Sequence, residues 1–175
     1  MRMLFTGVTG FVGSHLAEYL IGHGDEVIGI KRWRSPMDNL DGVSVKLLDG
    51  DLTDPGSTRS CVDIASPSVI YHLAAQSYVP FSYEAPRATM EANVIGTLNL
   101  VEALRGSSTV TQSRFVFAST GGAVYGDFVT PPNKESSPKD PESPYAISKL
   151  GVEYYLAYYG RVHGMDAVAL RYGNV

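Results

Sequence analysis

A glycine-rich turn near the N-terminus constrains the fold of this chain more than any other stretch. Gly7, Gly10 and Gly13 follow an apolar run, Arg2 to Thr6, and precede a helical pattern. Such a strand–turn–helix unit brings backbone N–H groups and the positive end of a helix dipole close to a pyrophosphate. A Cβ at these positions would block the approach. The three glycines in this context therefore predict a dinucleotide site.

The rest of the chain alternates short apolar runs with helical patterns, as parallel α/β sheets do. One helix is expected over Tyr83 to Arg105, and another begins at Ser143, an N-cap followed by Pro144. These elements predict a Rossmann-like, doubly wound parallel sheet in the order 3-2-1-4-5-6, with helices on both faces. The six expected strands are residues 2–6, 27–30, 45–48, 68–73, 114–118 and 166–170.

Composition limits the class of protein. A length of 175 residues suits one domain, and a net charge of −4 gives no general attraction to nucleic acid or to an acidic membrane surface. We find no transmembrane run or signal peptide, and the single Cys61 cannot form an internal disulfide, so a cytoplasmic protein is expected. No metal is expected either, because the spacing of Asp41, Asp49, Asp51 and Asp54 fits no cation-binding loop.

Three cations follow the second strand, at Lys31, Arg32 and Arg34. In dinucleotide-binding folds an acidic residue at this strand end binds the ribose hydroxyls of NAD, whereas cations favour the 2′-phosphate of NADP. We therefore expect NAD or NADP as cofactor, with NADP favoured. The alternative is a solvated basic loop.

The spacing Gly7-Val-Thr-Gly-Phe-Val-Gly13 resembles the cofactor loop of the extended short-chain dehydrogenases/reductases, the group that contains nucleotide-sugar epimerases and dehydratases. The resemblance covers essentially the whole chain and implies an NAD(P)-binding Rossmann domain over residues 1–175. It also implies a homodimer formed through two long helices, and a C-terminal substrate-binding domain that this chain lacks. The chain is then either a fragment of a longer enzyme or a natural short form.

The resemblance also implies which residues contact ligands. Its substrate positions are Ser77, Thr120 and Asn174. We interpret His72 and Asn93 as structural, since a polar side chain in a packed element needs a partner. Beyond the glycines and cations named above, its cofactor positions are Phe11, Val12, Asp51, Leu52, Leu73, Ala74, Ala75, Gln76, Tyr145, Lys149 and Tyr172. The tyrosines interpreted as an aromatic packing face or dimer surface are Tyr154, Tyr155, Tyr158 and Tyr159.

Thr120, Tyr145 and Lys149 are the expected catalytic residues. Thr120 follows the fifth strand, and Lys149 lies one turn from Tyr145 on the same helix face. A phenol has a pKa of about 10, and we expect the Lys149 ammonium and an oxidised nicotinamide to favour the phenolate. Tyr145 then takes the proton of a sugar hydroxyl as hydride leaves the same carbon, and Thr120 binds the reacting oxygen.

Two motifs favour different reactions. The segment from Ser119 to Gly126 resembles UDP-sugar 4-epimerases, whereas related dehydratases follow this threonine with a carboxylate where Gly121 and Gly122 stand here. The Arg-Trp-Arg-Ser-Pro loop resembles GDP-mannose dehydratases and GDP-4-keto-6-deoxymannose reductases. We expect a UDP-hexose type 4-epimerase that oxidises C4 transiently. The alternatives are a GDP-4-keto-6-deoxy-sugar reductase, a GDP-mannose 4,6-dehydratase-like enzyme, or a non-catalytic NAD(P)-binding module.

Overall fold

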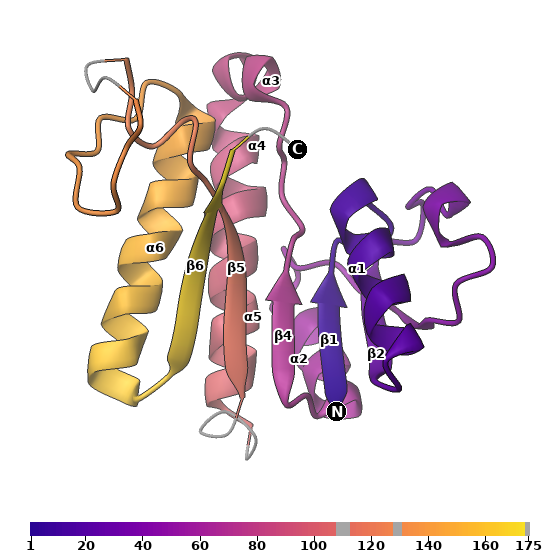
Figure 1. The fold of residues 1–175 in the computed structure, drawn as a ribbon. Coiled ribbons are helices and arrows are strands. Elements are labelled where there is room, and N and C mark those ends of the chain that lie inside the picture. Colours follow the sequence, from indigo (N-terminus) through magenta and orange to yellow (C-terminus); the bar gives the residue numbers. More distant parts are fainter. Residues whose placement is uncertain (108–112, 128–130, 174–175) are drawn as a thin grey trace.

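The computed structural model describes residues 1–107, 113–127 and 131–173. Within this part, six parallel strands form one sheet in the order β3-β2-β1-β4-β5-β6 (Figure 1). The predicted fold and strand order are confirmed. The strands are β1 (Arg2–Thr6), β2 (Glu26–Lys31), β3 (Lys46–Asp49), β4 (Val69–His72), β5 (Arg114–Thr120) and β6 (Asp166–Tyr172).

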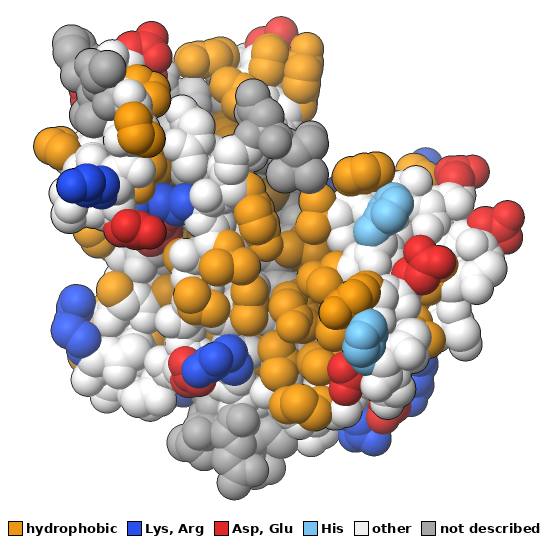
Figure 2. Space-filling view, in the orientation of Figure 1, with side chains coloured by type: hydrophobic (Ala, Val, Ile, Leu, Met, Phe, Trp, Pro, Cys, Tyr) orange, Lys and Arg blue, Asp and Glu red, His pale blue; other side chains and the backbone are white. Residues whose placement is uncertain are grey.

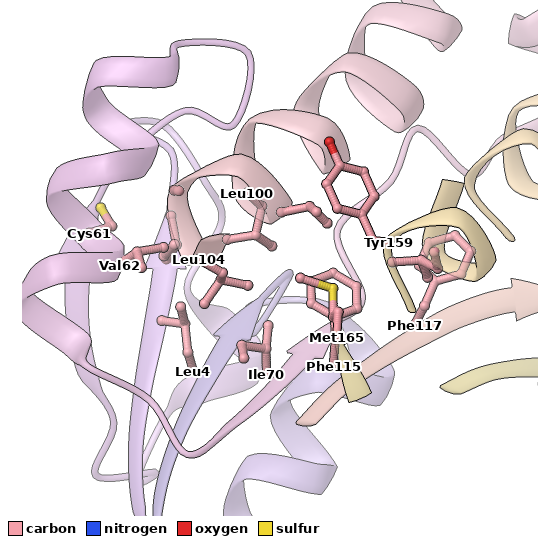
Figure 3. Packing of buried hydrophobic residues seen from close by; sticks show 14 of the residues in the cluster. Leu4, Cys61, Val62, Ile70, Leu100, Leu104, Phe115, Phe117, Tyr159 and Met165 are labelled. Atoms are coloured by element: carbon pink, nitrogen blue, oxygen red, sulfur yellow. The ribbon is translucent and has the colours of Figure 1, made fainter. Parts of the chain in front are cut away.

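Helices cover the sheet on both faces, and side chains alternate along each strand to meet them. Leu4 of β1 packs into a large cluster with α2, α5 and α6, which Figure 3 shows from close by. Its neighbours Met3 and Phe5 face the other way, into a smaller cluster with α1 and η1. The helices are α1 (Phe11–Gly22), η1 (Asp38–Leu40), α2 (Pro55–Ala65), α3 (Val79–Glu84), α4 (Pro86–Met90), η2 (Glu91–Ile95), α5 (Gly96–Arg105) and α6 (Pro144–His163).

The α1 face of the sheet is covered unevenly. Figure 2 shows hydrophobic side chains gathered on this face, beside α1. On β6, Val168 and Leu170 are 39% and 38% exposed. Among the described residues, no helix combines the length and apolar character that crossing a membrane requires.

The single long helix predicted over Tyr83 to Arg105 is wrong. The structure has α3 and α4 separated at Ala85, then a π-helical segment, η2, then α5. Pro86 explains the break, because the residue before a proline is disfavoured in the α region, and Ala85 has φ −133° and ψ 64°. The π-helical segment surrounds Asn93, and such segments occur frequently at functional sites.

Candidate active site

The glycine-rich turn brings two loops into close contact at the carboxyl end of β1. Gly7 has a φ of +74°, and a Cβ there would lie 2.7 Å from the backbone nitrogen of Ala74. A Cβ on Gly13 would lie 2.3 Å from the carbonyl oxygen of Gly7. Real Cβ atoms essentially never come so close to backbone, so the turn requires glycine at both positions. Gly10 caps α1 without any side-chain hydrogen bond, which leaves the N-terminus of the helix open to a ligand.

A cavity of about 640 Å³ lies along this edge of the sheet. It brings together predicted cofactor positions from the ends of four strands, β1 to β4, and the predicted substrate position Ser77 also lines it. The buried Oε1 of Gln76 has no hydrogen-bond partner among the described residues, so a polar acceptor remains for a ligand. The predicted positions that line the cavity are Gly7, Gly10, Lys31, Arg32, Asp51, Leu52, Leu73, Ala74, Ala75, Gln76 and Ser77.

Other predicted cofactor positions lie outside this cavity. Phe11 is the first residue of α1 and is 63% exposed, while Val12 is half-buried and Gly13 is buried behind the turn. Arg34 lines a neighbouring hollow of about 580 Å³, together with Arg32 and Trp33.

Several lining residues were not predicted from the sequence. Thr9 had a signal, since it lies inside the glycine-rich turn. Ala88 and Ala92 had one as well, because small residues four apart on a helix leave room beside it. The unpredicted lining residues are Thr6, Thr9, Ile30, Ser35, Gly50, Thr53, Phe81, Ala88 and Ala92.

The cations of the basic loop differ in their surroundings. The Lys31 ammonium forms an ion pair with the carboxylate of Asp49 at the end of the neighbouring strand β3. Its side chain is 17% exposed, whereas Trp33 is 81% exposed. Part of the Lys31 charge is therefore neutralised by Asp49, whereas Arg32 and Arg34 form no ion pair within the described part of the chain.

Thr120, Tyr145 and Lys149 come together between the ends of β5 and α6. Ser143 caps α6 by accepting a hydrogen bond from the Ala146 N–H at 3.1 Å, which sets Tyr145 in the first turn. Thr120 forms a hydrogen bond with the Tyr145 hydroxyl. The Lys149 Nζ atom lies 5.9 Å from the centre of the Tyr145 ring.

The ionisation of this cluster differs from the prediction. Burial raises the pKa of Tyr145, and only the hydrogen bond from Thr120 opposes it. The expected lowering of the Tyr145 pKa is therefore not present in the protein without a bound cofactor. Burial also lowers the pKa of Lys149 to about 8, and its Nζ donates to the Ala118 carbonyl oxygen at 2.7 Å. Near neutral pH, most Lys149 side chains carry a charge that is poorly solvated.

Asn93 connects this cluster to the cavity. Its Oδ1 accepts a hydrogen bond from the Gln76 N–H at 2.7 Å, and its Nδ2 donates to the Gln76 carbonyl oxygen and to the Ser148 hydroxyl. Ser148 in turn donates to the Tyr145 carbonyl oxygen at 2.6 Å. The structural interpretation of Asn93 is therefore confirmed. Asn93 makes these contacts from within the π-helical segment η2.

The remaining predicted residues have distinct positions. Tyr172 pairs directly with Thr120 across β5 and β6. His72 is buried between Thr6 and Thr97, and burial, followed by the Lys149 charge, lowers its pKa to about 3, so it is neutral and structural. Tyr159 is buried in the core, whereas Tyr154, Tyr155 and Tyr158 are exposed. Asn174 lies outside the described residues.

The fold and this arrangement define a class: a Rossmann-type domain with a dinucleotide turn and a Thr–Tyr–Lys cluster at the sheet edge. The family model "GDP-mannose 4,6 dehydratase" matches residues 4–175. The chain belongs to the NAD-dependent epimerase/dehydratase family of short-chain dehydrogenases/reductases, a family of nucleotide-sugar enzymes.

Some of the relatives are named as dehydratases and others as epimerases. GDP-mannose 4,6-dehydratase of Vibrio cholerae is 37% identical over 95% of this chain and 47% of its own length. A putative UDP-glucose 4-epimerase of Methanocaldococcus jannaschii is 35% identical over 99% of this chain and 55% of its own. The solved UDP-glucose 4-epimerase of Thermus thermophilus, a complex with NAD, has a TM-score of 0.89 at 39% identity, over 98% of this chain and 55% of that one. This chain spans about half the length of these relatives.

The two glycines of α1 provide a matched test of the turn. We expect Gly13→Ala to reduce the free energy of unfolding by about 1–3 kcal/mol, because a new methyl group must displace packed backbone. Gly22→Ala, in the same helix, meets nothing within 4 Å and should stay within about 0.5 kcal/mol of the parent. Urea unfolding measures both, and equal stabilities of the two variants would contradict the close approach.

The buried Lys149 predicts a pH dependence of stability. Its pKa is about 8 in the folded protein and 10.5 ordinarily, so between these pH values the unfolded chain binds more protons. The burial penalty is thus fully present below pH 8 and is relieved as the pH rises to 10.5. Relative to Lys149→Met, the parent should gain about 3 kcal/mol over this window, at about 1.4 kcal/mol per pKa unit. Parallel unfolding curves for parent and variant would contradict the shift.

Proposed function

We propose that this chain is the cofactor-binding part of an NAD(P)-dependent enzyme that epimerises a nucleotide hexose at C4. The observation that carries the proposal is the cluster of Thr120, Tyr145 and Lys149 at the strand end, joined through Asn93 to the cavity edge at Gln76. A bound nicotinamide dinucleotide would supply the acceptor and donor of hydride.

The residues of the cavity suit such a cofactor. The turn from Gly7 to Gly13 would hold the pyrophosphate against the N-terminus of α1. Asp51 and Leu52 would line the adenine pocket, and the segment 73–76 would pass under the nicotinamide ribose. The unpartnered Gln76 Oε1 supports this assignment, since it offers a buried acceptor in that segment.

The chemistry of the cluster follows from its charges. As a phenolate, Tyr145 would accept the proton of the C4 hydroxyl. The Lys149 ammonium lies close enough to stabilise that negative charge, and in the protein alone burial keeps the phenol protonated. Thr120 would donate a hydrogen bond to the reacting oxygen and orient it between the two side chains.

The residues after Thr120 favour epimerisation over dehydration. Eliminating water across C5 and C6 needs an additional acid or base, and Gly121 to Val124 carry none. Lack of space does not explain the absence of a side chain at position 122, because a Cβ on Gly122 would meet nothing within 4 Å. Of the acids that follow, Glu142 accepts a hydrogen bond from the Asp127 N–H at 3.1 Å.

A second candidate is a GDP-sugar enzyme, either a 4,6-dehydratase or a reductase of a 4-keto-6-deoxy sugar. The matching family model, the relatives named as GDP-mannose 4,6-dehydratases and the Arg-Trp-Arg-Ser-Pro loop favour it. Both candidates share oxidation or reduction at C4, so the same cluster serves each of them. Their products differ.

Tyr145→Phe tests the shared chemistry. With UDP-glucose, UDP-galactose and GDP-mannose as substrates, we expect turnover to fall at least about 100-fold, because the acid–base group is lost. Tyr19→Phe, at a side chain that is 61% exposed on α1, is the control and should retain full activity. Mass spectrometry distinguishes the candidates: a product of unchanged mass indicates epimerase, and loss of water indicates dehydratase.

Two further outcomes concern the remaining alternatives. Consumption of NADPH with a GDP-4-keto-6-deoxy sugar would indicate the reductase. Binding of NAD(P) without turnover of any of these sugars would leave the non-catalytic module and contradict the proposed function.

We also propose NADP as the preferred cofactor. Arg32 and Arg34 line the hollow beside the adenosine end of the cavity, and their charges have no carboxylate partner among the described residues. Arg32→Ala should weaken NADP binding about 10-fold and leave NAD binding unchanged, because charged hydrogen bonds contribute about 1.5–3 kcal/mol. Arg59→Ala, whose side chain pairs with Asp63 on α2, is the control. Calorimetric titration showing equal losses for NAD and NADP would contradict this preference.

The exposed side of α6 supports a homodimer formed through the long helices. Tyr154, Tyr155 and Tyr158 are 65%, 45% and 44% exposed. Large aromatic side chains gathered on one helix are typical of protein interfaces.

A further inference from the structure

A second, partly buried polar cluster lies one helical turn beyond Lys149, outside the proposed reaction. Glu153 of α6 and Arg171 of β6 form a bidentate ion pair, with Nε and Nη2 at 3.0 and 2.5 Å from the two carboxylate oxygens. The Glu153 and Arg171 side chains are only 11% and 18% exposed. Burial would raise the pKa of Glu153, but the hydrogen bonds from Arg171 and Ser119 lower it, so the carboxylate is charged.

Glu153 holds one cross-strand pair of the sheet. Ser119 on β5 and Arg171 on β6 are direct partners in the parallel register. The Ser119 hydroxyl donates to the same carboxylate at 2.5 Å, so Glu153 accepts hydrogen bonds from both members of the pair. The next pair toward the carboxyl edge is Thr120 with Tyr172. The Glu153 carboxylate is therefore hydrogen-bonded to Ser119, the residue directly before the proposed catalytic Thr120.

One face of α6 contacts the last three residues of β5 in succession. Tyr145, Lys149 and Glu153 are spaced by four residues, which places them on the same side of the helix. Lys149 binds the carbonyl oxygen of residue 118, Glu153 the side chain of residue 119, and Tyr145 the side chain of residue 120. Of the three contacts, the one through Glu153 is the only one that also includes β6.

Arg171 extends the same contact to the loops above the strand end. Its Nη1 donates to the Tyr125 hydroxyl at 2.6 Å and to the Glu135 carbonyl oxygen at 3.3 Å. The guanidinium carbon also lies 5.2 Å from the centre of the Tyr125 ring. Tyr125 belongs to the turn that directly follows Thr120, so one side chain fixes both the strand end and that turn.

We infer that Glu153 is a positioning residue, which acts through Ser119 and Arg171 to hold Thr120 and residues 121–126 in place relative to Tyr145. The inference rests on the proposed function, since it assigns a role in that reaction. Its physical basis is the direction of the hydrogen bonds. A bidentate pair has one low-energy geometry, and removing one partner of this partly buried pair leaves a poorly solvated charge without compensation. An apolar pair of similar volume would fill the space without imposing that geometry.

The test compares Glu153→Gln with Asp166→Asn. Asp166 pairs with Arg114 at 2.8 Å across the same two strands, but at their opposite end and exposed to solvent. The Glu153→Gln variant should lose about 10- to 100-fold in kcat per folded molecule, because displacements near 1 Å cost up to about 100-fold in rate. Its KM and its NAD(P) dissociation constant should remain within about twofold, since neither residue of the pair lines the cavity. The control should match the parent in all three constants.

Hydrogen–deuterium exchange supplies a readout that is independent of turnover. In Glu153→Gln, exchange should accelerate in residues 118–126 and remain unchanged in residues 2–31, with or without cofactor. Unchanged kcat together with unchanged exchange in residues 118–126 would overturn the inference. So would a fall in activity that follows only the folded fraction measured by circular dichroism.

A second variant tests the inference where Glu153→Gln does not fold. Should Glu153→Gln fail to fold, Ser119→Ala removes one hydrogen bond and leaves the ion pair intact, and a kcat loss of at least about threefold with unchanged KM is then expected. A parent-like kcat in that variant would overturn the inference. Failure of the proposed function has a different signature, because the parent itself would show no turnover while the exchange comparison would still show whether Glu153 orders residues 118–126.

Discussion

The contact between the glycine turn after β1 and the backbone after β4 is the constraint on which the site depends. Gly7 is held against Ala74, and Gly13 against Gly7 itself, at distances that exclude any side chain. Because β1 and β4 are neighbours in the sheet, these two segments form one continuous floor under the cavity. The N-terminus of α1 and the loops that follow β2 and β3 line other parts of the cavity.

The proposed chemical groups are supplied by the second half of the chain, and a few polar contacts join the two halves. Parallel strands carry all their carboxyl ends to one edge, which puts Thr120 beside the loops of the first half. Asn93 is the direct connection, since its amide binds Gln76 on one side and Ser148 of α6 on the other. The π-helical segment is therefore part of the site's architecture.

Local sequence patterns were sufficient to predict the sheet and the glycine turn, because each has a signal within a few residues. The Thr120, Tyr145 and Lys149 cluster was predicted from the order of these motifs along the chain, since Thr120 lies far from Tyr145 in the sequence. The helix break at Ala85 and the Glu153–Arg171 pair were not predicted. The apolar periodicity of residues 83–105 continues through Pro86, so it hid the helix break. The Glu153–Arg171 pair joins an interior helix position to a strand position, which only the folded register brings together. Burial, rather than neighbouring charge, decides the pKa of Tyr145 in the free protein.

The four-residue spacing on α6 has a consequence for how this chain tolerates changes in length. Each residue of an α-helix advances about 100° around the axis and 1.5 Å along it. A single insertion or deletion between residues 145 and 153 would rotate Glu153 away from the strand end while Tyr145 stays in place. Residues 131–142 lie before the helix cap and carry no such angular relation, so natural length variation should accumulate there and be absent from the first three turns of α6.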